Sequence, residues 1–204
     1  PEYIEEMKPL TGLPFFQTPG NHDHDLWESG DFATMAKYKQ NIGPSYYSYN
    51  LGKVHGVVLD DIDCANPGTG KNATYTNNLV QEQLDWLKKD LSHVSKDTPI
   101  IVSMHAQMFA NPGTGQTPNY AMTASSASQL EDILDDFTTV HIFTGHTHKM
   151  YNVDRTLTKN GIYEHNAGAV CATWWVNGVY NIEANIAADG VPGYANRHMT
   201  GGYQ

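Results

Sequence analysis

Positively charged side chains are scarce in this sequence. Its 204 residues include 12 Lys and Arg against 22 Asp and Glu, which gives a formal net charge of −10. Nucleic acids and anionic membranes are bound through basic surfaces, so this balance argues against both as partners. The same acidity would repel a phosphorylated ligand unless a bound cation reversed the local field.

Long apolar runs and cysteines are also in short supply. No run approaches the roughly 18–20 residues of a transmembrane helix, and we find no signal-peptide pattern after Pro1. The two cysteines, Cys64 and Cys171, can pair or stay free, so they do not define a redox compartment. The location stays open, with an extracytoplasmic (periplasmic or secreted) one favoured. The oligomeric state stays open as well.

What the sequence does contain is an alternation of apolar, β-branched runs with amphipathic segments, without any low-complexity tract. The predicted strands are Leu13–Thr18, Tyr46–Asn50, Val54–Asp60, Pro99–His105, Val140–Thr144, Gly161–Ala167 and Val170–Val176. The predicted helices are Tyr3–Leu10, Met35–Tyr38, Leu79–Leu91 and Ser128–Phe137. This order predicts a layered α/β domain over residues 1–176, followed by a tail, 177–204, that leads toward a further C-terminal domain.

Polar side chains gather where three of these strands end. They are Asn21, His22, Asp23, His105, His146 and His148. Ligands of α/β proteins bind at the carboxyl ends of the strands, so we expect these groups to share one site. Imidazole nitrogens and an amide oxygen suit borderline divalent metals such as Zn, Mn or Fe. Each histidine alone would be read as a hydrogen-bonded structural residue, but the ordered set favours a metal site.

The motifs Gly20–Asp23 (GNHD), His105 after a strand and Gly145–His148 (GHTH) occur here in an order that resembles the calcineurin-like metallophosphoesterase superfamily. Gly43–Asp60 and Gln83–Leu91 agree with it, and Gly168 onward is similar to bacterial members with an extra C-terminal domain. The resemblance covers about residues 10–195. It implies a four-layer α/β/β/α sandwich of two mixed sheets. It also implies metal-dependent hydrolysis of a phosphorylated small molecule or phosphodiester by two divalent ions (Mn, Fe or Zn).

The resemblance also assigns roles to individual residues. Asn21, His105 and His146 match ligands of the second metal, and His148 matches a ligand of the first. His22 matches the catalytic imidazole that contacts the substrate phosphate and protonates the leaving oxygen. Asp23 matches the carboxylate that orients this imidazole.

Two motifs of the family are missing from the expected place. An Asp-x-His and a Gly-Asp-x-x-Asp motif should precede Asn21, but Pro1–Gly20 contains neither, and Asp60, Asp61 and Asp63 come too late in the order. We therefore expect a domain without its first strands, partial metal occupancy or none, and weak or absent activity of this chain alone. One alternative is a catalytically silent binding or scaffold domain. Another is a hydrolase with a single metal ion.

Other polar residues carry weaker arguments. His24 and Asp25 are expected to be ordinary loop residues, and His55 and His141 to be hydrogen-bonded structural histidines within strands. The sequence Ala-Asn-Pro-Gly-Thr-Gly occurs at 65–70 and again at 110–115, where turn chemistry alone explains it.

Overall fold

The computed structural model describes residues 2–10, 12–64, 74–110, 119–156 and 161–168, and the structural statements below concern these residues. No helix in this part of the chain has the length and apolar character needed to cross a membrane. The predicted strand Val170–Val176, the tail, Cys171 and both Asn-Pro-Gly-Thr-Gly repeats lie outside the described residues.

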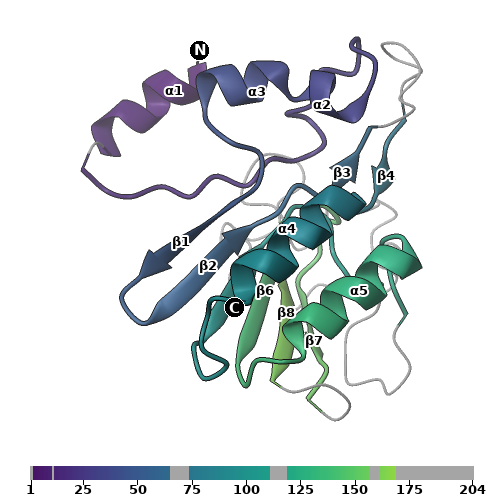
Figure 1. Cartoon of the computed structure of the whole chain (residues 1–204). Helices are drawn as coiled ribbons and strands as arrows, with labels where there is room; N and C mark the ends of the chain where they lie inside the picture. Colours follow the sequence, from purple (N-terminus) through teal and green to yellow (C-terminus); the bar gives the residue numbers. More distant parts are fainter. Residues whose placement is uncertain (1, 11, 65–73, 111–118, 157–160, 169–204) are drawn as a thin grey trace, which may run out of the picture.

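A six-stranded mixed sheet forms the centre of the structure (Figure 1). Its order is β1 (Tyr47–Leu51), β2 (Val54–Val58), β5 (Ile100–Ser103), β6 (Val140–Thr144), β8 (Ile162–Asn166) and β7 (Tyr151–Asp154). The four inner strands are parallel, and β1 and β7 pair antiparallel at the two edges. The parallel strands thus direct their carboxyl ends to one edge, as predicted for the site.

A second sheet contains β3 (Ile62–Asp63) and β4 (Thr76–Asn77). The predicted α/β class with two sheets is therefore confirmed, and in the described residues the second sheet has two strands.

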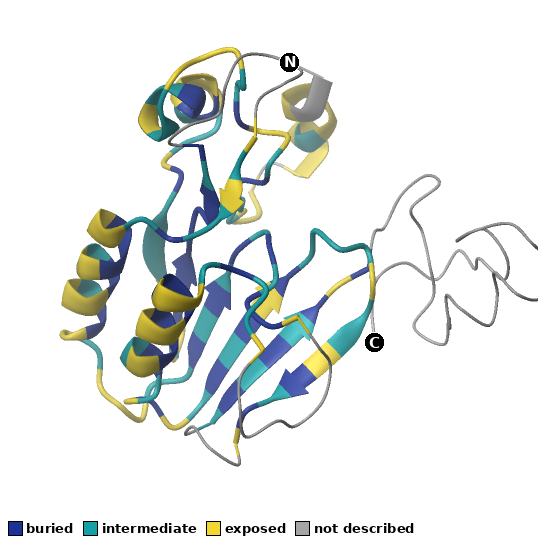
Figure 2. Cartoon of the chain, turned by 90° about the vertical axis from the view of Figure 1, so that its right-hand side faces the viewer, coloured by how far each residue is buried: buried dark blue, intermediate teal, exposed yellow. Residues whose placement is uncertain are grey.

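Two helices cover one face of the large sheet (Figure 2). In α4 (Gln81–Leu91), the buried residues Leu84, Leu87 and Leu91 follow the i, i+3, i+7 spacing that predicted this helix. Together with α5 (Ala124–Leu134), α4 packs on the strands to form the main hydrophobic core. Burial of these apolar side chains holds the sheet edge that carries the candidate site.

The N-terminal part lies beyond one end of the sheet (Figures 1 and 2). It contains α1 (Glu2–Met7), the 3₁₀ turn η1 (Lys8–Leu10), α2 (Asp31–Thr34) and α3 (Ala36–Asn41). The predicted strand Leu13–Thr18 is wrong, because this segment has no strand partner in the described structure. The Phe16 ring instead stacks on Tyr49 with ring centroids 3.5 Å apart, and the Tyr47 hydroxyl donates to the Gln17 carbonyl at 3.0 Å.

One predicted helix has different bounds, and one strand was missed. Helix α5 covers Ala124–Leu134 rather than Ser128–Phe137. Its start was missed because its first turn consists of Ala and Ser without a large apolar residue. Its end was placed too late because Phe137 is buried, although it lies in a turn after the helix. Strand β7 was not predicted, because only Val153 of its four residues is buried and so short an edge strand has little alternation.

Candidate metal centre

The Gly20–Asp23 motif and the two loops that follow strands meet at the carboxyl edge of the large sheet. The loop after β5 carries His105, and the loop after β6 carries His146 and His148. The Gly145 backbone N–H donates to the His105 carbonyl at 2.9 Å, so the two loops are joined directly. Asn21 reaches the same place from the N-terminal part, 84 positions earlier than His105.

Three donor atoms converge at this edge. His105 Nε2 lies 2.8 Å from Asn21 Oδ1 and 3.1 Å from His146 Nδ1. Two ligands that each lie about 2.1 Å from one ion are roughly 3.0–3.5 Å apart, so a slight widening of these distances or a side-chain rotation lets all three bind a single ion. One amide oxygen and two imidazole nitrogens form a donor set suited to Zn, Mn or Fe. The residues present therefore fit a divalent metal.

The electrostatics of the site favour metal binding by its imidazoles. Burial, together with the smaller effects of nearby His146, His22 and His148, lowers the pKa of His105 to about 4. Burial is also the main cause of the lowered pKa of His146. Both imidazoles are thus neutral at pH 7, and each keeps a lone pair for a cation.

Close backbone packing brings Asn21 to His105. A Cβ added at Gly20 would lie 2.9 Å from Nδ1 of His105, closer than side chains normally approach, so glycine permits this contact. His146 and His148 both have φ of 60°, a conformation that residues other than glycine rarely adopt. Such strain is typical of functional sites.

Buried carboxylates support the loops, and the sequence alone did not identify them as part of the site. The Asp61 carboxylate accepts hydrogen bonds from the backbone N–H of His105 at 3.0 Å and of Ala106 at 2.8 Å, and burial raises the pKa of Asp61 to about 8. Glu164 accepts from the backbone N–H of Met108 at 2.7 Å. The sequence shows Asp61 directly after a predicted strand and Glu164 within another, but their role as acceptors for loop amides depends on the three-dimensional fold.

The remaining predicted residues are placed differently. His22 and Asp23 are exposed, and the Asp23 carboxylate accepts from the Gly20 backbone N–H at 2.8 Å. Among the described residues, no hydrogen bond joins Asp23 to the His22 imidazole. His148 is half-buried, and it does not join His105 and His146 in a trio of donor atoms within 4.8 Å of one another in the described part of the chain. The structure therefore brings together Asn21, His105 and His146.

Of the predictions for histidines outside the motifs, those for His55 and His141 agree with the structure and the one for His24 does not. His55 is hydrogen bonded to Asn50 and Asp90, and His141 pairs with His165 at 2.8 Å, so both are structural as predicted. His24 was expected to be an ordinary loop residue, but it is 6% exposed, because its ring packs inward against Thr34 and Asp60.

Comparison with known families agrees with this geometry. A model of the family described as calcineurin-like phosphoesterase matches residues 1–150. The chain belongs to the calcineurin-like phosphoesterase family. Phosphoester hydrolysis with divalent metal ions is the chemistry associated with this family.

Two curated relatives are both from Arabidopsis thaliana. Purple acid phosphatase 15 is 28% identical over 153 residues, which cover 70% of this chain and 26% of that protein. Purple acid phosphatase 13 is 24% identical over 197 residues, which cover 90% of this chain and 32% of that protein. The chain thus spans about a quarter to a third of the length of these two relatives.

Proposed function

We propose that this chain contributes the Asn21, His105 and His146 half of a binuclear metal centre that hydrolyses phosphate esters. The observation that carries the proposal is the convergence of one amide oxygen and two imidazole nitrogens at one edge of the sheet. His105 Nε2 lies 2.8 Å from Asn21 Oδ1 and 3.1 Å from His146 Nδ1. Family membership supports the same chemistry.

The divalent ions would supply a water of lowered pKa and neutralise the oxygens of the phosphoryl group. Asn21, His105 and His146 would hold the second ion, and His148 would hold the first. A further carboxylate bridging the two ions is expected from the motifs that Pro1–Gly20 lacks. For this reason we expect the 204-residue chain by itself to hydrolyse phosphate esters slowly or not at all.

His22 is the group proposed to handle a proton. Its side chain is exposed, and it is close enough to His105 and His146 to lower the pKa of both. From this position the protonated imidazole would contact the phosphate and donate its proton to the leaving oxygen. The Asp23 carboxylate, already anchored on the Gly20 N–H at 2.8 Å, would orient His22 by a small side-chain rotation.

A hydrolysis assay tests this proposal. We would measure release of the aryl alcohol from an aryl phosphate monoester and from a bis-aryl phosphate diester, with Mn²⁺, Zn²⁺ or Fe²⁺ added to chelator-treated protein. Any turnover should require the metal and should disappear in His105→Ala. The control His93→Ala should keep the turnover, because His93 is an exposed residue that follows α4, away from the strand-end loops. Turnover that survives His105→Ala would contradict the assignment.

The competing function is a silent binding domain, which would keep the Asn21, His105 and His146 donors but lack the Asp-x-His and Gly-Asp-x-x-Asp motifs of an active enzyme. Addition of a peptide or longer chain that supplies both motifs separates the two functions. Restored metal-dependent turnover supports the enzyme, and metal binding without turnover supports the silent domain.

A further inference from the structure

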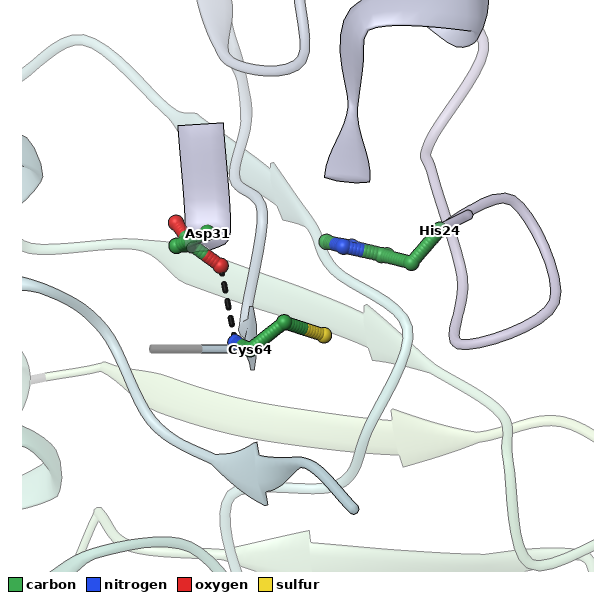
Figure 3. Close-up of side chains that lie close together, drawn as sticks. All are labelled: His24, Asp31 and Cys64. Atoms are coloured by element: carbon green, nitrogen blue, oxygen red, sulfur yellow. Dashed lines mark hydrogen bonds between the residues drawn. The ribbon is translucent and has the colours of Figure 1, made fainter. Parts of the chain in front are cut away.

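A second cluster of metal-ligating side chains lies where the N-terminal part meets the end of β3. His24, Asp31 and Cys64 each offer one ligand atom, and these atoms all lie within 4.8 Å of one another. Figure 3 shows the His24 ring and the Cys64 side chain extending toward each other, with the Asp31 carboxylate beside Cys64. His24 and Cys64 are buried, whereas Asp31 is half-buried and leaves a route to solvent.

The hydrogen bonds of His24 leave one ring nitrogen in need of a cation. The Thr34 hydroxyl donates its only proton to the Asp31 carbonyl at 2.7 Å. Nδ1 of His24, 2.9 Å from the same hydroxyl oxygen, must then carry a hydrogen and donate it. Nε2 of a neutral imidazole is therefore a bare lone pair, and it faces Asp60 Oδ1 at 3.3 Å. Two acceptors at this distance need a proton or a metal ion between or beside them.

Negative charge is concentrated around the same point. Burial raises the pKa of the Asp31 carboxyl, and the charges of Asp60 and Asp63 raise it further. Burial, the charge of Asp31 and, to a smaller extent, the charges of Asp60 and Asp63 raise the pKa of the Cys64 thiol to about 11. A divalent cation would compensate these charges and would stabilise the thiolate.

We propose that His24, Asp31 and Cys64 form a site for one thiophilic divalent ion, with Zn²⁺ as the fitting metal. The donor set of imidazole, carboxylate and thiolate suits zinc, whose ligands lie about 2.0–2.3 Å away and roughly 3.5 Å from each other. Because the ligand atoms all lie within 4.8 Å of one another, a contraction of at most about 1.3 Å reaches this geometry. Asp60 Oδ1, 3.3 Å from Nε2 of His24, is a further carboxylate oxygen beside the cluster.

The site differs from the candidate phosphoesterase centre in its residues and its chemistry. Asn21, His105 and His146 offer only nitrogen and oxygen, whereas this cluster contains sulfur. A zinc ion here would cross-link three segments: the loop after the Gly20–Asp23 motif, the start of α2 and the residue after β3. It would fix the N-terminal part onto the sheet. The inference does not depend on phosphoester hydrolysis.

Cobalt substitution tests the proposal in the full chain. Co²⁺ added to chelator-treated protein should produce a near-ultraviolet thiolate-to-cobalt charge-transfer band, which a nitrogen and oxygen site cannot produce. The band should be absent in Cys64→Ser and unchanged in Cys171→Ser, which removes the other cysteine. We expect Asp31→Asn and His24→Gln to weaken Co²⁺ binding about tenfold or more, and Zn²⁺ should displace the cobalt.

A second measurement avoids reliance on the folding of Cys64→Ser. In Cys171→Ser protein, Zn²⁺ should slow modification of the single thiol by a disulfide reagent by at least tenfold, and Asp31→Asn should remove this protection. A folded wild-type chain without the charge-transfer band would overturn the proposal. So would a band that disappears in Cys171→Ser but remains in Cys64→Ser, or a thiol that reacts equally fast with and without Zn²⁺.

Discussion

The two regions that meet at the candidate metal centre are held in different ways. The strand-end loops carrying His105 and His146 rest on a sheet whose strands and covering helices share one continuous core. The N-terminal part that carries Asn21 exposes several large apolar side chains. These are Leu13 at 62%, Phe15 at 43%, Trp27 at 75% and Phe32 at 78%.

The difference shows which contacts determine the geometry of the site. On the sheet side, buried Asp61 and Glu164 accept N–H groups of the loop after β5, so the conformation of the loop that carries His105 is fixed by several bonds. On the N-terminal side, Asn21 is positioned by the close approach of Gly20 to His105 and by a few side-chain contacts. Disturbing the sheet should therefore affect stability, and disturbing the N-terminal part should affect mainly the site.

The largest expected difference comes from truncating one leucine in each region. Leu130 of α5 is fully buried in the main core, so Leu130→Ala should lower the free energy of unfolding by about 2–5 kcal/mol. The matched change Leu13→Ala, at an exposed residue, should alter it by less than about 0.5 kcal/mol. Urea denaturation of both variants measures this, and equal losses would remove the distinction between the regions.

The pH dependence of stability should reveal the buried carboxyl that supports the sheet side. Burial raises the pKa of Glu164 from its ordinary 4.5 to about 7, against the opposing effect of its hydrogen bonds to the Met108 and Phe109 N–H groups and the Thr144 hydroxyl. Between these two pKa values the folded state binds more protons than the unfolded state. The contribution of Glu164 to stability is therefore fully present below pH 4.5, and it is lost as the pH rises toward 7.

The free energy of unfolding lost through Glu164 over this pH interval amounts to about 3 kcal/mol at most. In Glu164→Gln this contribution should vanish, and the free energy of unfolding should change less between pH 4.5 and 7 than in the wild type. Denaturation curves across this interval provide the measurement. An identical pH slope in the variant would show that Glu164 does not titrate in this way.

The site itself should respond to a single methyl group on the N-terminal side. In Gly20→Ala the added Cβ would lie 2.9 Å from Nδ1 of His105, so the ring must move and metal affinity should fall about tenfold. Gly145→Ala is the matched control at the same site, since its Cβ would lie 3.8 Å from the His105 carbonyl in ordinary contact. Zn²⁺ titration compares them, and equal affinities would argue against the close approach of Gly20.

The smallest predicted effect concerns a contact that attaches the N-terminal part to the sheet. Tyr47→Phe removes the hydroxyl that donates to the Gln17 carbonyl at 3.0 Å, while the ring remains. We expect a loss of about 0.5–1.5 kcal/mol in stability. Thermal unfolding of the variant measures it, and a loss as large as that of Leu130→Ala would mean that the N-terminal part is as strongly fixed as the core.

Sequence reasoning was most successful where periodicity and strand order carry the information. The spacing of Leu84, Leu87 and Leu91 predicted α4, and the alternation of strands and helices placed His105 and His146 at one sheet edge. The segment Leu13–Thr18 has an equally apolar pattern, but a strand also needs a hydrogen-bonded neighbour, and that depends on tertiary structure.

The supporting contacts were beyond sequence reasoning for a similar reason. His24 looked like part of a polar loop, and only the fold shows that Thr34, Asp60 and Cys64 surround it. A local sequence pattern cannot show which distant segment packs against a loop residue.

The central claim is that Asn21, His105 and His146 bind one divalent ion together. The most direct test is Zn²⁺ competition against a chromophoric chelator, performed in a Cys64→Ser background so that the sulfur-containing cluster does not contribute. Asn21→Ala and His105→Ala should each weaken binding at least tenfold, whereas the exposed-residue control His93→Ala should bind as tightly as the parent protein. Unchanged Zn²⁺ affinity in both Asn21→Ala and His105→Ala would contradict the claim.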